Sequence, residues 1–210
     1  MSHSTLEHDA ANPWHARVVE VARVVLQRAR STEPTLGAGR LICIDGPAGS
    51  GKSTLGRAVL AAASAFGSAH LIHLDDLLEG WGGLARVGET LDRDVLAPLG
   101  DGRPGRYRRY DWELDRFAEE RVVPPADFLV VDGVGSGASS YSSSITTLVW
   151  VEAPRDLRLA RGIARDGEQV RPQWRQWMLD EDALFRRERT RERADVLVDG
   201  TGTGEQSVLV

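Results

Sequence analysis

A glycine-rich segment in the first quarter of the chain holds its only lysine. The segment reads GPAGSGKST from Gly46 to Thr54 and matches the pattern G-x-x-x-x-G-K-[ST]. Glycines in such a loop let backbone N–H groups approach phosphate oxygens closely, and the Lys52 ammonium reaches the outer phosphates. The Ser53 hydroxyl is a suitable ligand for Mg²⁺. We therefore predict a binding site for ATP and Mg²⁺ that is formed by Gly46, Ala48, Gly49, Ser50, Gly51, Lys52, Ser53 and Thr54.

Aspartates end two of the apolar segments that we expect to be strands. Asp132 follows the run FLVV, the arrangement of a Walker-B carboxylate that holds Mg²⁺ directly or through water. Asp75 ends the segment that begins at His70, and a carboxylate there is suited to orient and deprotonate an acceptor hydroxyl. The alternatives are a turn aspartate before Gly133 and a helix cap formed by the Asp75-Asp76 pair.

Short apolar segments separated by helical patterns predict the architecture that positions these groups. The segments are continuously apolar, as in strands that are buried on both faces of a parallel sheet. Ligands of such sheets bind at the carboxyl ends of the strands, where the glycine-rich loop, Asp75 and Asp132 would meet. We predict an α/β fold of the P-loop NTPase type, a three-layer αβα sandwich with a mainly parallel sheet of about five strands. The expected strands are 41–44, 70–75, 127–131, 147–151 and 196–198.

The remaining segments are arranged around this sheet. We predict a disordered lead over 1–12, an N-terminal helix and linker over 13–39, a P-loop domain over 40–200 and a tail over 201–210. Apolar residues recur at helical spacing after Pro13, a residue that suits the start of a helix. Within the domain we expect helices over 54–66, 89–99, 115–121, 155–165 and 174–193, and loops over 100–109 and 135–144.

Composition argues against several classes of protein. The 210 residues carry a net charge of −5, whereas general nucleic-acid binders are basic. Cys43 is the single cysteine, which excludes an intrachain disulfide and favours a reducing compartment. No apolar run approaches the roughly 18 residues of a membrane span, and the first residues lack a signal-peptide core. We expect a cytoplasmic protein that acts on a small molecule, without nucleic acid or membrane as partner. Its oligomeric state does not follow from the sequence.

Five motifs resemble, in their order, the uridine kinase-like family of P-loop kinases. They are GPAGSGKST, LDDLL, YDW, RLARGIARD and ADVLVDG, and the resemblance extends over residues 40–200. It implies that Asp75 matches the family's catalytic aspartate and that YDW lies near the nucleoside. It also implies a mobile lid over about 155–175, whose arginines neutralise the transferring phosphoryl group. The residues implied to be catalytic are Asp75, Lys52, Arg161 and Arg165, and those implied to bind substrate are Asp75, Tyr110, Asp111 and Arg158.

The chain departs from this family's pattern at positions on the acceptor side and in the lid. Leu77 and Leu78 replace a phenylalanine and a tyrosine after the catalytic aspartate, and Asp115 replaces a substrate-side histidine. Gly162 stands where the lid has one of its arginines. These changes leave the residues of the kinase mechanism in place, but they affect the region in which uridine or cytidine would bind.

Residues and resemblance together predict an ATP-dependent small-molecule kinase that transfers the γ-phosphoryl group to an acceptor hydroxyl, with a nucleoside as first candidate. Two alternatives stay open. One is a kinase of another small acceptor, such as a nucleoside monophosphate, pantothenate or a sugar acid, and the other is a non-catalytic ATP-binding regulatory module. A guanine-specific switch is excluded, because its N-K-x-D motif cannot form when Asn12 is the only asparagine and Lys52 the only lysine.

Three further patterns allow more than one interpretation. The segment RPGRYRRY has three possible interpretations. A solvated loop is ranked first, a loop whose arginines contact an anionic acceptor is second, and a nucleic-acid contact is last. Trp174 and Trp177 are spaced for packing in the core or the lid. His70 and His73 lack clustered partners in the sequence, so we predict no metal site there.

Overall fold

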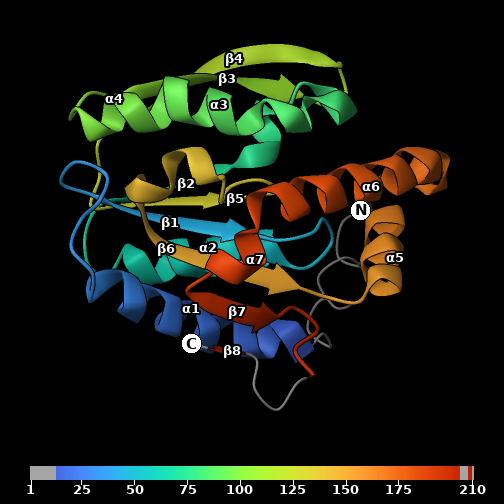
Figure 1. Cartoon of the computed structure of the whole chain (residues 1–210), viewed down its shortest axis with the longest axis horizontal. Coiled ribbons are helices and arrows are strands. Elements are labelled where there is room, and N and C mark those ends of the chain that lie inside the picture. Colours follow the sequence, from blue (N-terminus) through green and yellow to red (C-terminus); the bar gives the residue numbers. More distant parts are fainter. Residues whose placement is uncertain (1–12, 204–207, 210) are drawn as a thin grey trace, which may run out of the picture.

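A mainly parallel sheet forms the centre of the molecule (Figure 1). The structure is a computed structural model that describes residues 13–203 and 208–209. The six described strands of this sheet are ordered β2-β5-β1-β6-β7-β8, and only β8 runs antiparallel to its neighbour. They span Ala69–His73 (β2), Phe128–Asp132 (β5), Arg40–Asp45 (β1), Ile145–Glu152 (β6), Val196–Asp199 (β7) and Val208–Leu209 (β8).

Continuous apolar sequence explains why the inner strands are covered on both faces. The residues of Leu41–Ile44 have no exposed surface, and β1 lies between β5 and β6 with Ile42 opposite Val130. A strand in that position must be apolar on both sides, which is the pattern of its sequence. The five parallel strands with helices on both faces confirm the predicted α/β sandwich of the P-loop NTPase type.

Two helices cover one face of the sheet. These are α1 (Pro13–Arg30) and α2 (Lys52–Ala63), and the helix predicted after residue 12 is therefore present. At the start of α1, the buried Trp14 packs against Gly51, where an added Cβ would lie 2.8 Å from the indole Nε1. The N-terminal helix thus forms part of the wall around the glycine-rich loop. The buried face of α1 consists of Trp14, Val18, Val21, Ala22, Val25, Leu26 and Ala29.

The second face of the sheet is covered by a different group of helices. A continuous helical rod comprises α3 (Val87–Leu91), the π-helical segment η3 (Asp92–Leu96) and α4 (Ala97–Gly100). The helices α5 (Arg155–Asp166) and α6 (Arg171–Glu188) lie at the end to which the strand arrows point (Figure 1). They are therefore on the side where the sequence predicts the site. The buried residues that these helices contribute to this face include Leu91, Val95, Leu96, Leu99, Trp177 and Leu184.

An antiparallel hairpin replaces a predicted loop and a predicted helix. The strand β3 (Gly105–Asp111) pairs with β4 (Arg116–Val123), so the loop expected over 100–109 and the helix expected over 115–121 are wrong. The arginines of β3 are typical of a solvated loop, and the alternation of a strand is interrupted, because Arg108 and Arg109 are adjacent and the register shifts between Arg108 and Tyr110. In β3, Tyr107 and Tyr110 are buried, whereas Arg106 and Arg108 are exposed.

Element boundaries differ from the predictions at several places, and at two of them a predicted element is shortened or divided. The second strand ends at His73, because the chain turns into a 3₁₀ segment, η1 (Leu74–Leu77), that carries both acidic residues of the LDDLL motif. The helix expected over 174–193 is divided into α6 and α7 (Thr190–Arg193). Arg189 separates them with a left-handed φ of 51°, a conformation that ends a helix.

The predicted ends of the chain are only partly described. The disordered lead predicted over 1–12 lies outside the described residues. The tail predicted over 201–210 contains β8, which pairs with β7 through Leu197 and Leu209. The loop expected over 135–144 ends in a 3₁₀ segment, η4 (Ser139–Ser144). Among the described helices, none has the length and apolar character that crossing a membrane requires.

Candidate active site

The glycine-rich loop connects β1 to α2 at the carboxyl edge of the sheet. Gly49 and Gly51 have φ angles of 79° and 108°, which residues with a Cβ rarely adopt. The helix N-terminus that follows directs free N–H groups toward the loop, an arrangement that suits phosphate. All predicted nucleotide-binding residues lie in this loop or in the first turn of α2: Gly46, Ala48, Gly49, Ser50, Gly51, Lys52, Ser53 and Thr54.

The ammonium of Lys52 lies within the loop. Its Nζ donates a hydrogen bond to the carbonyl of Pro47 at 3.0 Å. Burial lowers the pKa of Lys52, while the carboxylates of Glu181 and Asp75 favour its charged form. A buried cation whose bonded partner is a neutral carbonyl can exchange that partner for a phosphate oxygen at little cost.

The predicted metal ligands are in contact with each other. Ser53 Oγ donates a hydrogen bond to Asp132 Oδ1 at 3.0 Å, at the point where α2 begins and β5 ends. A hydroxyl and a carboxylate are hard oxygen ligands of the kind that Mg²⁺ prefers. Sites for phosphoryl transfer hold this ion with few protein ligands and complete its shell with phosphate and water. The two residues therefore fit the predicted ion.

A histidine that the sequence analysis assigned to no site contacts Asp132. His73 Nδ1 lies 2.9 Å from Asp132 Oδ2, and this hydrogen bond raises the pKa of His73. The contact arises because β2 and β5 are neighbours with His73 directly opposite Asp132. Only the strand order reveals this pairing, since 58 residues separate the two along the chain.

Asp75 lies in η1, just beyond the end of β2. Solvent reaches its carboxylate, but the surrounding protein weakens its hydration and raises its pKa. Lys52 opposes this rise, Asp132 adds to it, and Arg165 opposes it more weakly. A carboxylate with a raised pKa is a stronger base than a free aspartate. Asp75 thus belongs to the same electrostatic group as the phosphate-binding lysine and the Walker-B aspartate.

The hairpin brings two aromatic residues of the YDW motif to this group. Trp112 Nε1 donates a hydrogen bond to the main-chain oxygen of Asp75 at 3.1 Å, and the residue is 40% exposed. The hydroxyl of Tyr110 donates to Asp115 Oδ1 at 2.5 Å, and this bond raises the pKa of Tyr110 to about 12. Asp115, the residue in place of the family's histidine, therefore serves as the acceptor for Tyr110.

Asp111, which is predicted to bind substrate, makes several hydrogen bonds within the hairpin. Its Oδ1 accepts the N–H groups of Glu113 and Leu114 at 3.1 and 3.0 Å, and its Oδ2 accepts Arg109 Nη2 at 3.0 Å. These bonds lower the pKa of Asp111. The carboxylate is therefore used to build the hairpin turn that presents Trp112.

Trp81 connects the hairpin to α6. It lies in a 3₁₀ segment, η2 (Gly80–Ala85), and makes edge-to-face contacts with three other tryptophans. The ring centroids are 5.7 Å from Trp112, 6.3 Å from Trp174 and 5.9 Å from Trp177. Because Trp174 and Trp177 are both buried, the packing role predicted for them is confirmed.

Of the three lid arginines, Arg165 alone interacts with Asp75 in the described structure. Its cationic charge opposes the rise in the pKa of Asp75, and Asp75 in turn favours the charged form of Arg165. Its Nε also donates to the adjacent Asp166 at 2.7 Å. The side chain remains largely exposed, so it is free to approach a phosphoryl group.

The other two arginines, Arg158 and Arg161, contact the glycine-rich loop in this structure. Arg161 Nη1 donates to the carbonyls of Gly49 and Gly200 at 3.1 and 3.3 Å, so it braces the loop from behind. Arg158 is buried, and its Nη1 pairs with Glu181 Oε1 at 2.6 Å. The arginines at helical spacing are present in α5, and two of them contact main-chain oxygens of the glycine-rich loop.

Asp45 is a second buried carboxylate that the sequence analysis assigned to no role. It is the last residue of β1, and its oxygens accept the N–H groups of Gly46, Gly135 and Gly137 at 2.7, 2.8 and 2.9 Å. Burial raises its pKa despite these bonds. Asp45 thereby ties the start of the glycine-rich loop to the loop that follows Asp132.

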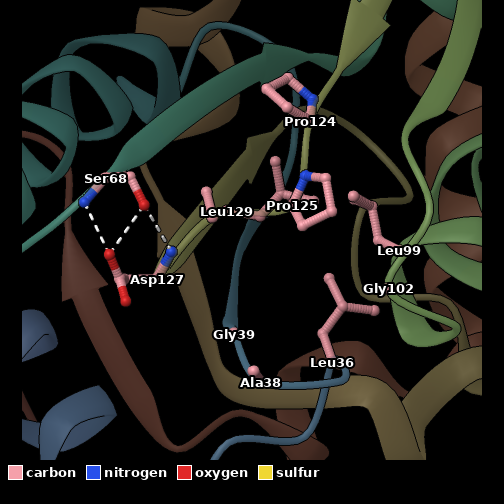
Figure 2. A pocket seen from close by; sticks show the side chains of 11 residues that line it. Leu36, Ala38, Gly39, Ser68, Leu99, Gly102, Pro124, Pro125, Asp127 and Leu129 are labelled. Carbon is pink, nitrogen blue, oxygen red and sulfur yellow. Dashed lines mark hydrogen bonds between the residues drawn. The ribbon is translucent and has the colours of Figure 1, made fainter.

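A cavity of about 260 Å³ lies at the opposite edge of the sheet (Figure 2). Gly39, Ser68 and Asp127 in its lining immediately precede β1, β2 and β5. The Asp127 carboxylate accepts both the N–H and the hydroxyl of Ser68, at 2.8 and 2.7 Å. Since the chemistry-bearing residues follow the carboxyl ends of the same strands, this cavity is not part of the candidate active site.

Comparisons with known proteins identify the fold. No protein-family model matches the sequence, and no curated protein matches it. The structure is similar to that of a possible uridine kinase from Bacillus stearothermophilus, with a TM-score of 0.62 and 20% identity over 87% of this chain and 97% of that one. It is also similar to a candidate fructose transport system kinase from Silicibacter sp., with a TM-score of 0.55 and 20% identity over 84% of this chain and 94% of that one.

Proposed function

We propose that this chain is an ATP-dependent kinase that transfers the γ-phosphoryl group to a hydroxyl of a small molecule. The convergence of three groups at one edge of the sheet carries the proposal. Lys52 lies in the glycine-rich loop, Asp132 contacts Ser53, and the charge of Asp75 interacts with both Lys52 and Asp132. The two similar structures are both of proteins described as kinases, which supports the reaction class.

ATP is expected to place its phosphates over the glycine-rich loop. Lys52 would leave the carbonyl of Pro47 and bind the outer phosphate oxygens. Ser53 and Asp132 would hold Mg²⁺, which when bound neutralises charge on the phosphates. His73 would fix the orientation of the Asp132 carboxylate by occupying its second oxygen.

Asp75 is the group that activates the acceptor. In this proposal the acceptor hydroxyl donates its proton to the Asp75 carboxylate as its oxygen attacks the γ-phosphorus. The bond between the γ-phosphorus and the oxygen shared with the β-phosphate breaks, and ADP leaves. Lys52 and Arg165 compensate the negative charge of the transferring group.

The acceptor would bind beside the aromatic residues of the hairpin. Trp112 offers an exposed ring next to Asp75, and Tyr110 is held in place by Asp115. A nucleoside is our first candidate, because it combines a planar base with a primary hydroxyl. A nucleoside monophosphate, pantothenate, or a sugar or sugar acid is the alternative acceptor. We infer a cytoplasmic location, with neither nucleic acid nor membrane as partner.

The proposal is tested by measuring ADP release from Mg·ATP against a panel of these acceptors. Wild-type protein and Asp75→Asn are assayed side by side, and ATP binding by each is measured separately. A turnover that requires one acceptor and disappears in the variant would establish the kinase and its substrate class. ATP binding without turnover on any acceptor would instead favour a regulatory module that binds nucleotide, and turnover unchanged by Asp75→Asn would reject the mechanism.

A further inference from the structure

A fully buried carboxylate contacts the glycine-rich loop beside its lysine. Glu181, on α6, is 0% exposed, and its Oε2 accepts the N–H of Ala48 at 2.8 Å. Its negative charge also acts on Lys52. A negative charge at this position opposes the binding of an anionic ligand, so its presence in a phosphate-binding loop requires a compensating group.

Arg158 supplies that compensation from α5. It is 5% exposed, and its Nη1 lies 2.6 Å from Glu181 Oε1. The same nitrogen lies 3.4 Å from the carbonyl of Ala48, and Nε donates to the carbonyl of Ala153 at 3.1 Å. The two side chains therefore contact both main-chain polar groups of Ala48, Arg158 from α5 and Glu181 from α6.

We propose that Arg158 and Glu181 are positioning residues for ATP binding. Together they hold Ala48 in the conformation of the phosphate-binding loop, and Arg158 neutralises a carboxylate that would otherwise repel the phosphates. Neither residue contacts the nucleotide, since both are enclosed by protein. The inference rests on the proposed function, because it takes ATP to be the ligand of the loop.

Two single variants are expected to change ATP affinity in opposite directions. Arg158→Met leaves Glu181 charged and unpaired beside Lys52, so the dissociation constant of Mg·ATP should rise about tenfold. Glu181→Gln keeps an oxygen that can accept the Ala48 N–H and removes the negative charge, so ATP affinity should stay equal or increase. The double variant should bind ATP within about threefold of wild type, because no unpaired charge remains.

Affinity is measured by titration calorimetry without acceptor, and stability by urea unfolding of the same samples. Both single variants should lower stability, since each leaves a buried partner unpaired. A structural role would make both single variants bind ATP more weakly, whereas the electrostatic role predicts weaker binding only for Arg158→Met. The matched control is Arg155→Met, which breaks an exposed ion pair with Asp182 (3.0 Å) that joins the same two helices away from the loop. It should leave ATP affinity unchanged.

The outcomes are distinguishable. The inference is overturned if both single variants weaken ATP binding in proportion to their loss of stability, or if the double variant binds as poorly as Arg158→Met. If Arg158→Met fails to fold, Arg158→Lys takes its place. This variant keeps the positive charge and should retain ATP affinity within about threefold. A tenfold loss would show that the shape of the guanidinium matters and not its charge, which would overturn the inference.

Failure of this inference can be distinguished from failure of the proposed function. If wild type binds ATP and the variants behave as expected but no acceptor is phosphorylated, only the proposed function fails. If wild type phosphorylates an acceptor while every variant binds ATP alike, only this inference fails, and absence of nucleotide binding by wild type rejects both.

Discussion

The indole of Trp174 lies directly against the backbone of Gly162. A Cβ added to Gly162 would come within 2.3 Å of Trp174 Cζ2. The indole Nε1 donates to Asp166 Oδ2 at 2.9 Å, and the guanidinium of Arg165 lies 5.7 Å from the ring centroid. The arginine that the uridine kinase-like pattern has at position 162 therefore has no space here, because Trp174 occupies it.

This packing predicts that Gly162→Ala destabilises the protein. In an exposed helix the change would stabilise by roughly 0.5–1 kcal/mol, whereas overpacking against a buried indole costs about 1–3 kcal/mol. Urea unfolding should show a net loss. Gly100→Ala in α4, where an added Cβ meets nothing within 4 Å, is the control and should not lower stability. An equal effect at both positions would contradict the assigned packing.

The position of Asp75 predicts that its replacement impairs phosphoryl transfer but not ATP binding. Asp75→Asn keeps the size of the side chain but removes the base, so transfer should fall by about 10²–10⁴ while ATP affinity is retained. Single-turnover assays and calorimetry measure the two quantities. Asp76→Asn, at the adjacent position of η1, is the matched control and should lower transfer by less than about tenfold. Equal losses in both variants would remove Asp75 from its proposed role.

The buried ammonium predicts the effect of Lys52→Ala. Without it the outer phosphates lose their main cationic partner from the loop, so turnover should fall by at least about a hundredfold and ATP should bind more weakly. The control is Arg57→Ala, which removes an exposed positive charge from the same helix. It should change turnover by less than about twofold. Comparable losses in the two variants would indicate a general charge effect.

The environment of Asp75 predicts the acid limb of the pH profile. The surrounding protein weakens the hydration of the Asp75 carboxylate and raises its pKa, and the base must be ionised to act, so kcat/KM should fall as the pH is lowered through a value above the usual range of aspartate. Arg165 favours the ionised form, so Arg165→Met should move this limb to higher pH. Arg171→Met, which breaks an ion pair with Glu168, should leave it in place. A limb that moves to lower pH in Arg165→Met would contradict the assignment.

The buried carboxylate of Asp45 predicts that its replacement by an amide lowers the stability of the protein. An amide at this position can accept fewer of the three loop N–H groups and directs its own donors at them. Asp45→Asn should therefore lower the free energy of unfolding by about 2–4 kcal/mol. Asp101→Asn, whose partner Arg103 is exposed, should change it by less than about 1 kcal/mol.

The sequence by itself determined the sheet and the conformation of the glycine-rich loop. Continuous apolar runs such as Leu41–Ile44 predict strands buried on both faces, and they are buried. The loop depends on glycines at fixed spacing, which adopt the left-handed conformations that such a loop needs. In both cases the information lies within a few consecutive residues. Local sequence was misleading in the hairpin, because the adjacent Arg108 and Arg109 and the register shift beside them interrupt the alternation of a strand in β3.

The tertiary structure alone decided which side chains meet. His73 reaches Asp132 because β2 lies beside β5 in one register, and Glu181 reaches Ala48 and Arg158 because α6 packs across α5 and the loop. A resemblance in the lid motif predicts that Arg158 lies near the acceptor, whereas in the structure it is buried and pairs with Glu181 beside the glycine-rich loop. Strand order and helix rotation are set by packing between distant segments, where many weak contacts act together. No short stretch of sequence records them, so these contacts had to be read from the folded chain.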